Sequence, residues 1–390
     1  MSRPLRILVA HNYYRLRGGE DTVAEAEVAL LRSRNHEVEF FTRSNGDIEE
    51  SQRLQLAVDA VWSSRSRDAI DEAILRFRPD VLHAHNTFPV LSPAVFHVAS
   101  DHRVPVVQTL HNFRLMCVQA MFLREGRVCE DCLGRLPWRG VVRRCYRSSV
   151  AQSAVVAGSV MAHRVIGTYQ RTVSRFIALN AFCKGKFVQG GLPAARIAVK
   201  PNFVEAPAFE DEPRQGGLFV GRLAPEKGLR TLVQAMALVR GARVDVLGEG
   251  PDESVGRNVP GLTLHGNASA QTVRAMMLKA AYLLMPSIWY ETFGLVVIEA
   301  FSCGLPVIAS RLGAMAELVA DGRTGALFDA SSAEDLARKI AWAEANPHAM
   351  RRMGEEARRE YEAKYTPDIN YRQLMAIYDQ AIHEVQQGRQ

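Results

Sequence analysis

The N-terminal half of the chain alternates short apolar runs with longer segments of mixed polarity. An apolar run at residues 7–10 is followed by a segment of helical pattern at 21–35 and by a second apolar run at 36–42. Two further runs, at 80–85 and 105–111, each end in polar residues. Short apolar strands that alternate with helices predict a parallel α/β sheet, with its chemistry at the carboxyl ends of the strands.

A second series of strands follows the acidic, proline-containing stretch at 205–213. Its members are short, apolar and end in Gly, Ser or Pro, at 217–221, 243–248, 262–266, 282–287 and 306–310. The two series predict two Rossmann-like domains, at 1–203 and 216–366, joined near 203–216. Residues 367–390 have a helical pattern and are too polar to add a strand, so they predict a C-terminal helix.

Composition adds a broad class and a compartment. The 390 residues exceed one typical core, and 47% hydrophobic with 23% charged residues is typical of a globular protein. The longest apolar stretch, at 148–163, is short for a membrane span and is broken by Gln and Ser. The N-terminus lacks a signal-peptide pattern, so we expect a cytoplasmic enzyme.

The net charge of +6 is unevenly distributed. Residues 1–200 hold 28 Lys and Arg against 18 Asp and Glu, whereas the remainder holds 20 against 24. Residues 132–204 contain twelve Lys and Arg and no acid. This basic field predicts an anionic partner, either the inner face of an anionic membrane or a lipid-pyrophosphate acceptor, rather than a solvated basic face. Sparse aromatic residues and the lack of a known module argue against nucleic acid.

Two carboxylates, Glu291 and Glu299, are separated by seven mostly apolar residues. A buried carboxylate is unfavourable unless a partner compensates its charge, so this spacing indicates a ligand site. Gly294 precedes a predicted helix whose first backbone N–H groups would bind an anion. A diphosphate could lie on these amides while each Glu accepts hydrogen bonds from sugar hydroxyls. A helix with an N-terminal acid and one surface Glu also fits the spacing alone.

Residues 221–228, Gly-Arg-Leu-Ala-Pro-Glu-Lys-Gly, lie between a predicted strand and a predicted helix. Arg222 can donate to two phosphate oxygens and Lys227 supplies a compact charge, which together offset roughly the two charges of a diphosphate. Gly-Glu-Gly at 248–250 lets the backbone approach a nucleotide. Taken singly, each glycine turn could equally be an ordinary strand-to-helix connection with no role in ligand binding.

These motifs belong to a larger ordered set. It comprises Gly-Arg-Leu-x-x-Glu-Lys-Gly at 221–228, Gly-Glu-Gly at 248–250, His-Gly at 265–266, Pro-Ser at 286–287, Glu-x7-Glu at 291–299, Gly-x-Pro-Val-Ile-Ala-Ser at 304–310, Glu317, Asp-Gly-x-Thr-Gly at 321–325 and Phe328. The chain therefore resembles the family 4 retaining glycosyltransferases over most of residues 216–330. The N-terminal half matches more loosely, through the glycines at 18–19, the strand at 80–85 and Thr-Leu-His-Asn at 109–112. The resemblance implies the GT-B fold, with two Rossmann-like domains facing across a cleft and a C-terminal helix that crosses back to the N-terminal domain.

The resemblance also implies roles for individual residues. The catalytic set is His111 at the reacting sugar, Glu291 on hydroxyls of the transferred sugar, and Arg222 and Lys227 on the diphosphate. The donor-binding set is Gly18, Gly19, Gly221, Glu249, Phe293, Gly294, Leu295 and Glu299, with Glu299 on the ribose hydroxyls and the first two glycines letting their loop approach the phosphates and acceptor.

The implied activity is retaining transfer of a hexosyl-type sugar from a nucleotide-diphosphate sugar to a glycan or lipid-linked acceptor, in polysaccharide or glycoconjugate synthesis. The leaving phosphate would take the acceptor proton, so the two Glu are not the acid and base of a glycoside hydrolase. No metal or other cofactor is expected at the diphosphate, where Arg222 and Lys227 supply the positive charge. An epimerase or phosphorylase of the same fold and a non-catalytic sugar-nucleotide-binding subunit remain alternatives, although the intact charged residues favour transfer.

Histidines and cysteines complete the candidates. His111 and Asn112 end a strand, which favours a site role for His111, whereas His83, His85 and His265 fit structural roles. Four of the six cysteines, Cys117, Cys129, Cys132 and Cys145, cluster in one insert at about 117–147 with a Cys-x2-Cys element. In a cytosolic protein this spacing predicts a structural zinc site ahead of a disulfide or redox role, with ordinary thiols as the main alternative. The insert departs from the family core and is expected to shape the acceptor entrance or a membrane contact.

Overall fold

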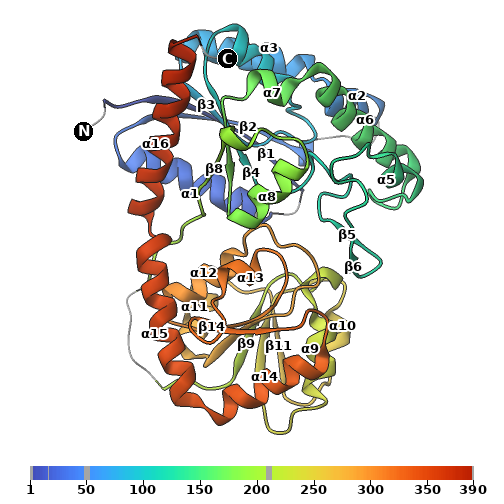
Figure 1. Ribbon diagram of the computed structural model, residues 1–390, viewed down its shortest axis with the longest axis vertical. Coiled ribbons are helices and arrows are strands. Elements are labelled where there is room, and N and C mark those ends of the chain that lie inside the picture. Colours follow the sequence, from blue (N-terminus) through green and yellow to red (C-terminus); the bar gives the residue numbers. More distant parts are fainter. Residues whose placement is uncertain (1–2, 16, 48–52, 208–212, 389–390) are drawn as a thin grey trace. The chain divides into compact units, whose positions relative to one another are not determined.

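The computed structural model describes residues 3–388 apart from residues 16, 48–52 and 208–212. The chain forms two compact units. Unit 1 comprises Met1–Phe122, Glu130–Lys200 and Tyr371–Gln390, and unit 2 comprises Leu123–Cys129 and Pro201–Asn370. Each unit contains a six-stranded parallel sheet, which confirms the prediction of two Rossmann-like halves (Figure 1).

The sheet of unit 1 has the strand order β2-β1-β3-β4-β7-β8. Its strands are β1 (Arg6–Tyr13), β2 (Glu37–Ser44), β3 (Val81–Asn86), β4 (Val106–Leu110), β7 (Arg175–Ala178) and β8 (Ile197–Val199). The order reverses between β1 and β3, which places a topological switch point at the carboxyl ends of these strands. The register pairs His11 of β1 with Asn86 of β3 after a shift at Ala10, so polar residues of both strands lie together.

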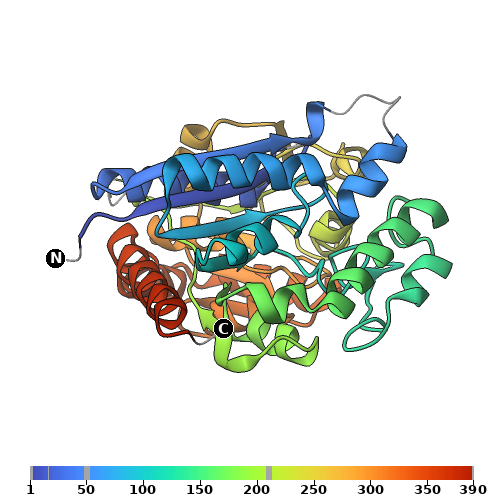
Figure 2. The same ribbon diagram turned by 90° about the horizontal axis from the view of Figure 1, so that it is seen from above.

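Helices lie on both sides of this sheet (Figures 1 and 2). They are α1 (Gly19–Ser33), α2 (Arg53–Val61), α3 (Ser64–Phe77), α4 (Val95–Asp101), α5 (Trp138–Val142), α6 (Val150–Ile166), α7 (Thr168–Thr172) and α8 (Ala181–Gln189), with 3-10 turns η1 (Asn45–Asp47) and η3 (Ala194–Arg196). The insert also forms a hairpin of β5 (Leu123–Arg124) and β6 (Arg127–Val128), whose residues belong to unit 2. The apolar stretch at 148–163 is α6, which begins with the Ser149 side chain capping the amide of Gln152.

The C-terminal helix α16 (Pro367–Gln386) packs on unit 1, as expected for a helix that crosses back. Leu374, Ile377 and Tyr378 are buried in the same core as Ile7 of β1 and Val81 of β3. This apolar face explains why the helix is retained in unit 1 although most of its sequence is polar.

The boundaries between the units differ slightly from the expected positions. Unit 2 begins at Pro201 rather than near 216, and unit 1 resumes at Tyr371 rather than at 367. Hydrogen bonds tie the connection to unit 2: Val204 donates to the carbonyl of Tyr365 at 3.3 Å, and the Asn370 side chain donates to Pro201 at 2.7 Å. The predicted linker at 205–213 lies partly outside the described residues.

Unit 2 has the strand order β11-β10-β9-β12-β13-β14, with every pair parallel. Its elements are β9 (Gly217–Val220), η4 (Pro225–Lys227), α9 (Leu229–Met236), β10 (Val244–Leu247), α10 (Glu253–Gly256), β11 (Leu262–Gly266), α11 (Ala270–Lys279), β12 (Tyr282–Met285), α12 (Leu295–Ser302), β13 (Val307–Ser310), α13 (Met315–Leu318), β14 (Gly325–Phe328), α14 (Ala333–Ala345) and α15 (Pro347–Lys364). The order reverses between β9 and β12, so the loops that follow these two strands flank a switch point.

Candidate active site

In unit 2 the predicted donor motifs gather at the β9–β12 switch point. Tight backbone contacts hold the loops there. A Cβ on Gly228 would lie 1.9 Å from the carbonyl oxygen of Pro286, and a Cβ on Gly248 would lie 1.9 Å from that of Gly221. Both glycines have positive φ, 78° and 137°. Glycine is required at these two positions by packing and backbone angle together, which explains the glycine turns of the sequence.

Lys227 and Glu291 form the central ion pair of this site. Nζ of Lys227 lies 2.7 Å from Oε1 of Glu291, and Oγ of Ser287 donates to the same oxygen at 2.8 Å. The Glu291 side chain is 7% exposed and that of Lys227 is 24% exposed. The ammonium also lies 5.5 Å from the ring centroid of Trp289. The charge of the buried Glu291 carboxylate is therefore compensated by Lys227 of the 221–228 motif.

Arg222 and Glu226 form a second pair in the same loop. The Arg222 side chain is 58% exposed, while that of Glu226 is 8% exposed. A guanidinium anchored by a buried carboxylate yet open to solvent can receive an anionic ligand. Glu249, at the end of β10, is exposed and its Oε1 accepts from the backbone N–H of Asn267 at 3.2 Å.

Helix α12 begins after Gly294, whose φ of 80° turns the chain into the helix. Phe293 is buried, and Leu295 is the first helical residue, so the first N–H groups of the helix follow Glu291 closely in the sequence. Glu299 lies in the second turn of α12 and is partly buried. Burial raises the pKa of the Glu299 carboxyl, and the charge of Arg274 opposes this rise.

In unit 1, histidines follow the carboxyl ends of adjacent strands. His111 is the first residue after β4, and its Nε2 lies 2.9 Å from Nδ1 of His85 at the end of β3. The two rings are stacked, with centroids 5.2 Å apart. Burial, followed by the neighbouring His85, holds the pKa of His111 well below its ordinary value, so the ring is neutral. Both residues line a small cavity of about 50 Å³, together with Asn86, Gln108 and Arg114.

The glycine loop at 18–19 leads into α1. The backbone N–H of Gly18 donates to Oδ2 of Asp21 at 2.8 Å, and the other oxygen of Asp21 lies 2.7 Å from Nε2 of the buried His11. A Cβ on Gly18 would meet no atom within 4 Å, and its φ of −125° suits any residue. The fold itself therefore does not require glycine at position 18, in contrast to positions 228 and 248.

Glu20 was not singled out by the sequence. It is the second residue of α1, and its Oε2 accepts a weak hydrogen bond from Nδ2 of Asn112 at 3.4 Å. Burial, followed by the charge of Asp21, raises the pKa of Glu20 to about 7, while Arg114 opposes the rise. Only its place beside the glycine pair could have indicated a role, since acids are common in the first turn of helices.

Glu27 was also missed. It lies on the buried face of α1 with Val23, Ala24 and Val28, where an acid is out of place. Its Oε2 pairs with Nζ of Lys200 at 2.9 Å, and its Oε1 lies 3.1 Å from Nδ1 of His83. An acid on an apolar helix face was the signal available in the sequence.

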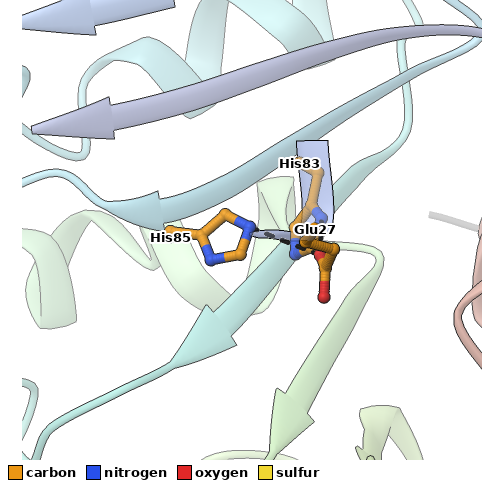
Figure 3. A group of neighbouring side chains, drawn as sticks. All are labelled: Glu27, His83 and His85. Carbon is orange, nitrogen blue, oxygen red and sulfur yellow. Dashed lines mark ion pairs between the residues drawn. The ribbon is translucent and has the colours of Figure 1, made fainter. Parts of the chain in front are cut away.

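His83, His265 and the four insert cysteines are the remaining candidates from the sequence. His83 lies within hydrogen-bond distance of Tyr378 and Thr109, and His265 pairs with Asp245 at the surface, 2.7 Å apart. Cys117, Cys129, Cys132 and Cys145 are each partly buried. Among the described residues, Glu27, His83 and His85 form a group whose potential metal-ligand atoms lie within 4.8 Å of one another (Figure 3).

No helix in the part of the chain that the structure describes combines the length and the apolar character needed to cross a membrane.

Two family models match consecutive parts of the chain. "Glycosyltransferase Family 4" matches residues 17–206, and "Glycosyl transferases group 1" matches residues 205–360. An uncharacterized glycosyltransferase, MJ1178 of Methanocaldococcus jannaschii, is 30% identical over 170 residues, which are 42% of this chain and 48% of that protein. The match thus spans about half the length of this relative. The D-inositol 3-phosphate glycosyltransferase of Arthrobacter sp. strain FB24 is 26% identical over 362 residues, 82% of this chain and 80% of that protein.

Solved structures support the fold. The crystal structure of Anabaena Alr3699/HepE in complex with UDP has a TM-score of 0.68 and 16% identity, and covers 95% of this chain and 98% of that one. Together the matched motifs, the two parallel-sheet units and these relatives agree on one assignment: the chain belongs to the family 4 glycosyltransferases and has the GT-B fold.

Proposed function

We propose that the chain transfers a sugar, with retention of anomeric configuration, from a nucleoside-diphosphate sugar to a hydroxyl of a glycan or lipid-linked acceptor in polysaccharide or glycoconjugate synthesis. The observation that carries the proposal is the Lys227–Glu291 pair at the β9–β12 switch point, beside the N-terminus of α12. A cation and helix amides at this place suit a diphosphate, and a buried carboxylate suits sugar hydroxyls. The neighbouring structure HepE has been solved with UDP and with UDP-glucose, which supports a nucleotide-sugar donor.

In the proposed reaction the bond between C1 of the sugar and the β-phosphate oxygen breaks, and its electron pair stays on the phosphate. The acceptor oxygen bonds to C1 on the same face, and its proton passes to the leaving phosphate oxygen. Lys227, Arg222 and the first amides of α12 stabilise the charge that develops on that oxygen. Glu291 holds hydroxyls of the transferred sugar, Glu299 holds the ribose, and neutral His111 faces the reacting sugar. With two cations on the diphosphate, we expect turnover to persist in excess EDTA.

The remaining donor residues would act through the backbone. Gly221 and Glu249 would border the nucleotide, the amides near Phe293, Gly294 and Leu295 would bind phosphate, and Gly18 and Gly19 would let the first loop approach it.

A donor panel tests the proposal. UDP-, GDP- and ADP-sugars are offered to wild type, to Lys227→Ala and to a control, Lys279→Ala, at the exposed end of α11. Selective binding with slow release of nucleoside diphosphate that needs Lys227 but not Lys279 is expected, and NMR of the product gives the anomeric configuration. A panel without selective binding, or hydrolysis that ignores Lys227, would contradict the proposal. The same panel would identify an epimerase, because the sugar of the donor would change configuration while no free nucleoside diphosphate is released.

We also propose that the insert contacts an anionic membrane carrying the acceptor. On and next to α5, Leu136, Trp138 and Val142 are 56%, 58% and 69% exposed. They alternate with basic residues, namely Arg135, Arg139, Arg143, Arg144 and Arg147. Asp131 pairs with Arg139 and Arg143, and no acid follows it before residue 205. Exposed apolar side chains among Arg residues suit the interface of an anionic bilayer.

Vesicle sedimentation tests this contact. Wild type should bind phosphatidylglycerol vesicles and not phosphatidylcholine vesicles, and Trp138→Ser/Val142→Ser should bind several-fold less. Trp342→Ser, at a 41% exposed Trp of unit 2, is the matched control and should bind as wild type does. Equal binding by all three proteins would remove the insert from the membrane contact.

The four insert cysteines remain our proposed structural zinc site. Their spacing in the sequence and their partial burial suit the ligands of a structural metal site. Protein purified without added metal should hold close to one equivalent of zinc, and Cys129→Ser should lose it. Metal-free wild type with four titratable thiols would end this proposal.

A further inference from the structure

A chain of buried polar side chains leads from α1 to His111. Glu27 lies on α1 and His85 on β3, and these residues and Lys200 are each no more than 3% exposed. Oε1 of Glu27 lies 3.4 Å from Nε2 of His85, whose Nδ1 in turn lies 2.9 Å from Nε2 of His111. Lys200 closes the other end, 2.9 Å from Oε2 of Glu27.

Glu27 is ionised although it is buried. Burial opposes its charge, but the ammonium of Lys200 and the neighbouring His83 hold the pKa of Glu27 well below its ordinary value. His85 is neutral, because burial and then the electrostatic effect of the neighbouring His83 lower its pKa to about 4. The chain therefore presents a fixed negative charge to one edge of a neutral imidazole.

Two buried atoms in this chain determine where the imidazole protons lie. Within the described residues, Oε1 of Glu27 and Nε2 of His85 have no hydrogen bond of standard geometry, and they are neighbours. A carboxylate oxygen only accepts, so the single proton of neutral His85 is favoured on Nε2, facing Glu27. Nδ1 of His85 then accepts, and His111 must donate from its own Nε2. Nδ1 of His111 consequently carries the lone pair of that ring.

We propose that Glu27 is a positioning residue that fixes the tautomer and ring orientation of His111 through His85. The proposal rests on the proposed role of His111 at the reacting sugar. A sugar hydroxyl can donate only to a ring nitrogen with a lone pair, so a mixture of tautomers would leave part of the enzyme unable to accept it. Glu27 thereby acts on the donor sugar without touching it.

A metal ion is a poorer occupant of the Glu27, His83 and His85 group (Figure 3). Lys200 already balances the charge of Glu27, so a divalent cation would add two buried charges without a counter-ion. His83 also has other partners, since its Nδ1 lies 2.7 Å from the hydroxyl of Tyr378 and its Nε2 lies 2.8 Å from that of Thr109. Charge and hydrogen bonding both favour a proton-positioning network.

The test reads the tautomer directly, by long-range ¹H–¹⁵N correlation on ¹⁵N-histidine protein, with the His111 signals identified by their loss in His111→Asn. Wild type should show His111 protonated at Nε2. Glu27→Gln/Lys200→Met removes both charges, so no ammonium is left unpaired in the core. It should give mixed tautomers, and kcat should fall about tenfold or more while the donor KM changes less than about twofold. Arg175→Met/Glu384→Gln removes another ion pair of unit 1 and is the matched control, expected to keep the wild-type tautomer.

An unchanged His111 tautomer in the Glu27→Gln/Lys200→Met variant would overturn the proposal, as would equal effects in the control. Metal that is bound by Cys129→Ser but lost from Glu27→Gln/Lys200→Met would overturn it in favour of a metal site. The tautomer readout needs no turnover. If the tautomer responds to Glu27 while His111→Asn remains fully active, the hold of Glu27 on His111 is supported and the proposed role of His111 in transfer fails.

Discussion

Replacing Lys227 by Met should separate the stability of unit 2 from its activity. The ammonium lies 2.7 Å from a Glu291 oxygen whose side chain is 7% exposed. At an effective dielectric constant of about 20, the direct attraction at this distance is about 6 kcal/mol, and the lost hydration of the two charges offsets most of it. Because Glu291 retains the Ser287 hydroxyl and Lys227 is partly exposed, the net loss in free energy of unfolding should be about 1–3 kcal/mol.

The double variant Lys227→Met/Glu291→Gln supplies the discriminating comparison. It leaves no unpaired buried charge, and the Gln carbonyl can still accept from Ser287, so most of the lost stability should return. The coupling free energy of the pair should be about 1–2 kcal/mol. Turnover should not return, because a bound diphosphate would still lack its ammonium and the transferred sugar would lack the Glu291 carboxylate.

Trp289 provides the assay, since its ring lies beside Lys227 in unit 2. With Trp62, Trp138 and Trp342 replaced by Phe, urea titration of the remaining fluorescence follows unfolding around this site. Release of nucleoside diphosphate from the donor gives activity. A coupling below about 0.3 kcal/mol would refute the pairing as a stabilising contact. Near wild-type turnover in the double variant would refute the diphosphate role of Lys227.

Three further outcomes are expected. Glu20→Gln should flatten the pH dependence of the free energy of unfolding. Because the pKa of Glu20 is raised from 4.5 to about 7, its stabilising contribution is complete below pH 4.5 and is lost as the pH rises through 7. Urea titrations at pH 5 and pH 8 test this, and a variant that keeps the wild-type difference in stability between the two pH values would contradict it. Glu299→Ala should weaken donor binding by about 1–3 kcal/mol in calorimetry because the ribose hydroxyls lose their acceptor, and unchanged affinity would remove that assignment. Gly18→Ala should keep the wild-type melting temperature, since its Cβ meets no atom within 4 Å, yet lower donor turnover; a destabilised protein would show a structural need for glycine instead.

The sequence predicts most strands of the two sheets and misses three short ones. Strands β1 to β4 and the glycine turns of unit 2 follow from apolar runs and punctuation, because their residue types are tied to local geometry. Strands β7, β8 and β14 have four residues or fewer and were not predicted, whereas the four-residue strands β9, β10, β12 and β13 were predicted, because Gly, Ser or Pro follows each apolar run. An apolar run of that length fits a strand, a helix segment or a buried loop equally well, and only pairing with neighbours in the sheet decides among them.

In the site, the sequence predicts the residues that belong to local motifs but not the contacts between distant residues. Gly221, Lys227, Glu291 and Glu299 could be named because their residue types and spacing recur as motifs along one short stretch of chain. That Lys227 compensates Glu291 could not be predicted, since the two lie 64 positions apart and meet only because β9 and β12 are neighbours in the sheet.

The side chains linked to His111 are a second case in which partners distant in the sequence could not be predicted. The sequence shows Glu27 as an acid on an apolar helix face. It does not reveal which residue balances this charge, because Lys200 lies 173 positions further along the chain. Tyr378, which contacts His83, comes from a helix 295 positions downstream that returns to unit 1. A buried charge is tolerated only where such partners converge, so Glu27, Lys200 and α16 are mutually dependent. Loss of α16 should therefore disturb His83 and, through the shared Glu27, the proton position on His111, even though the helix contributes no residue of the proposed donor site.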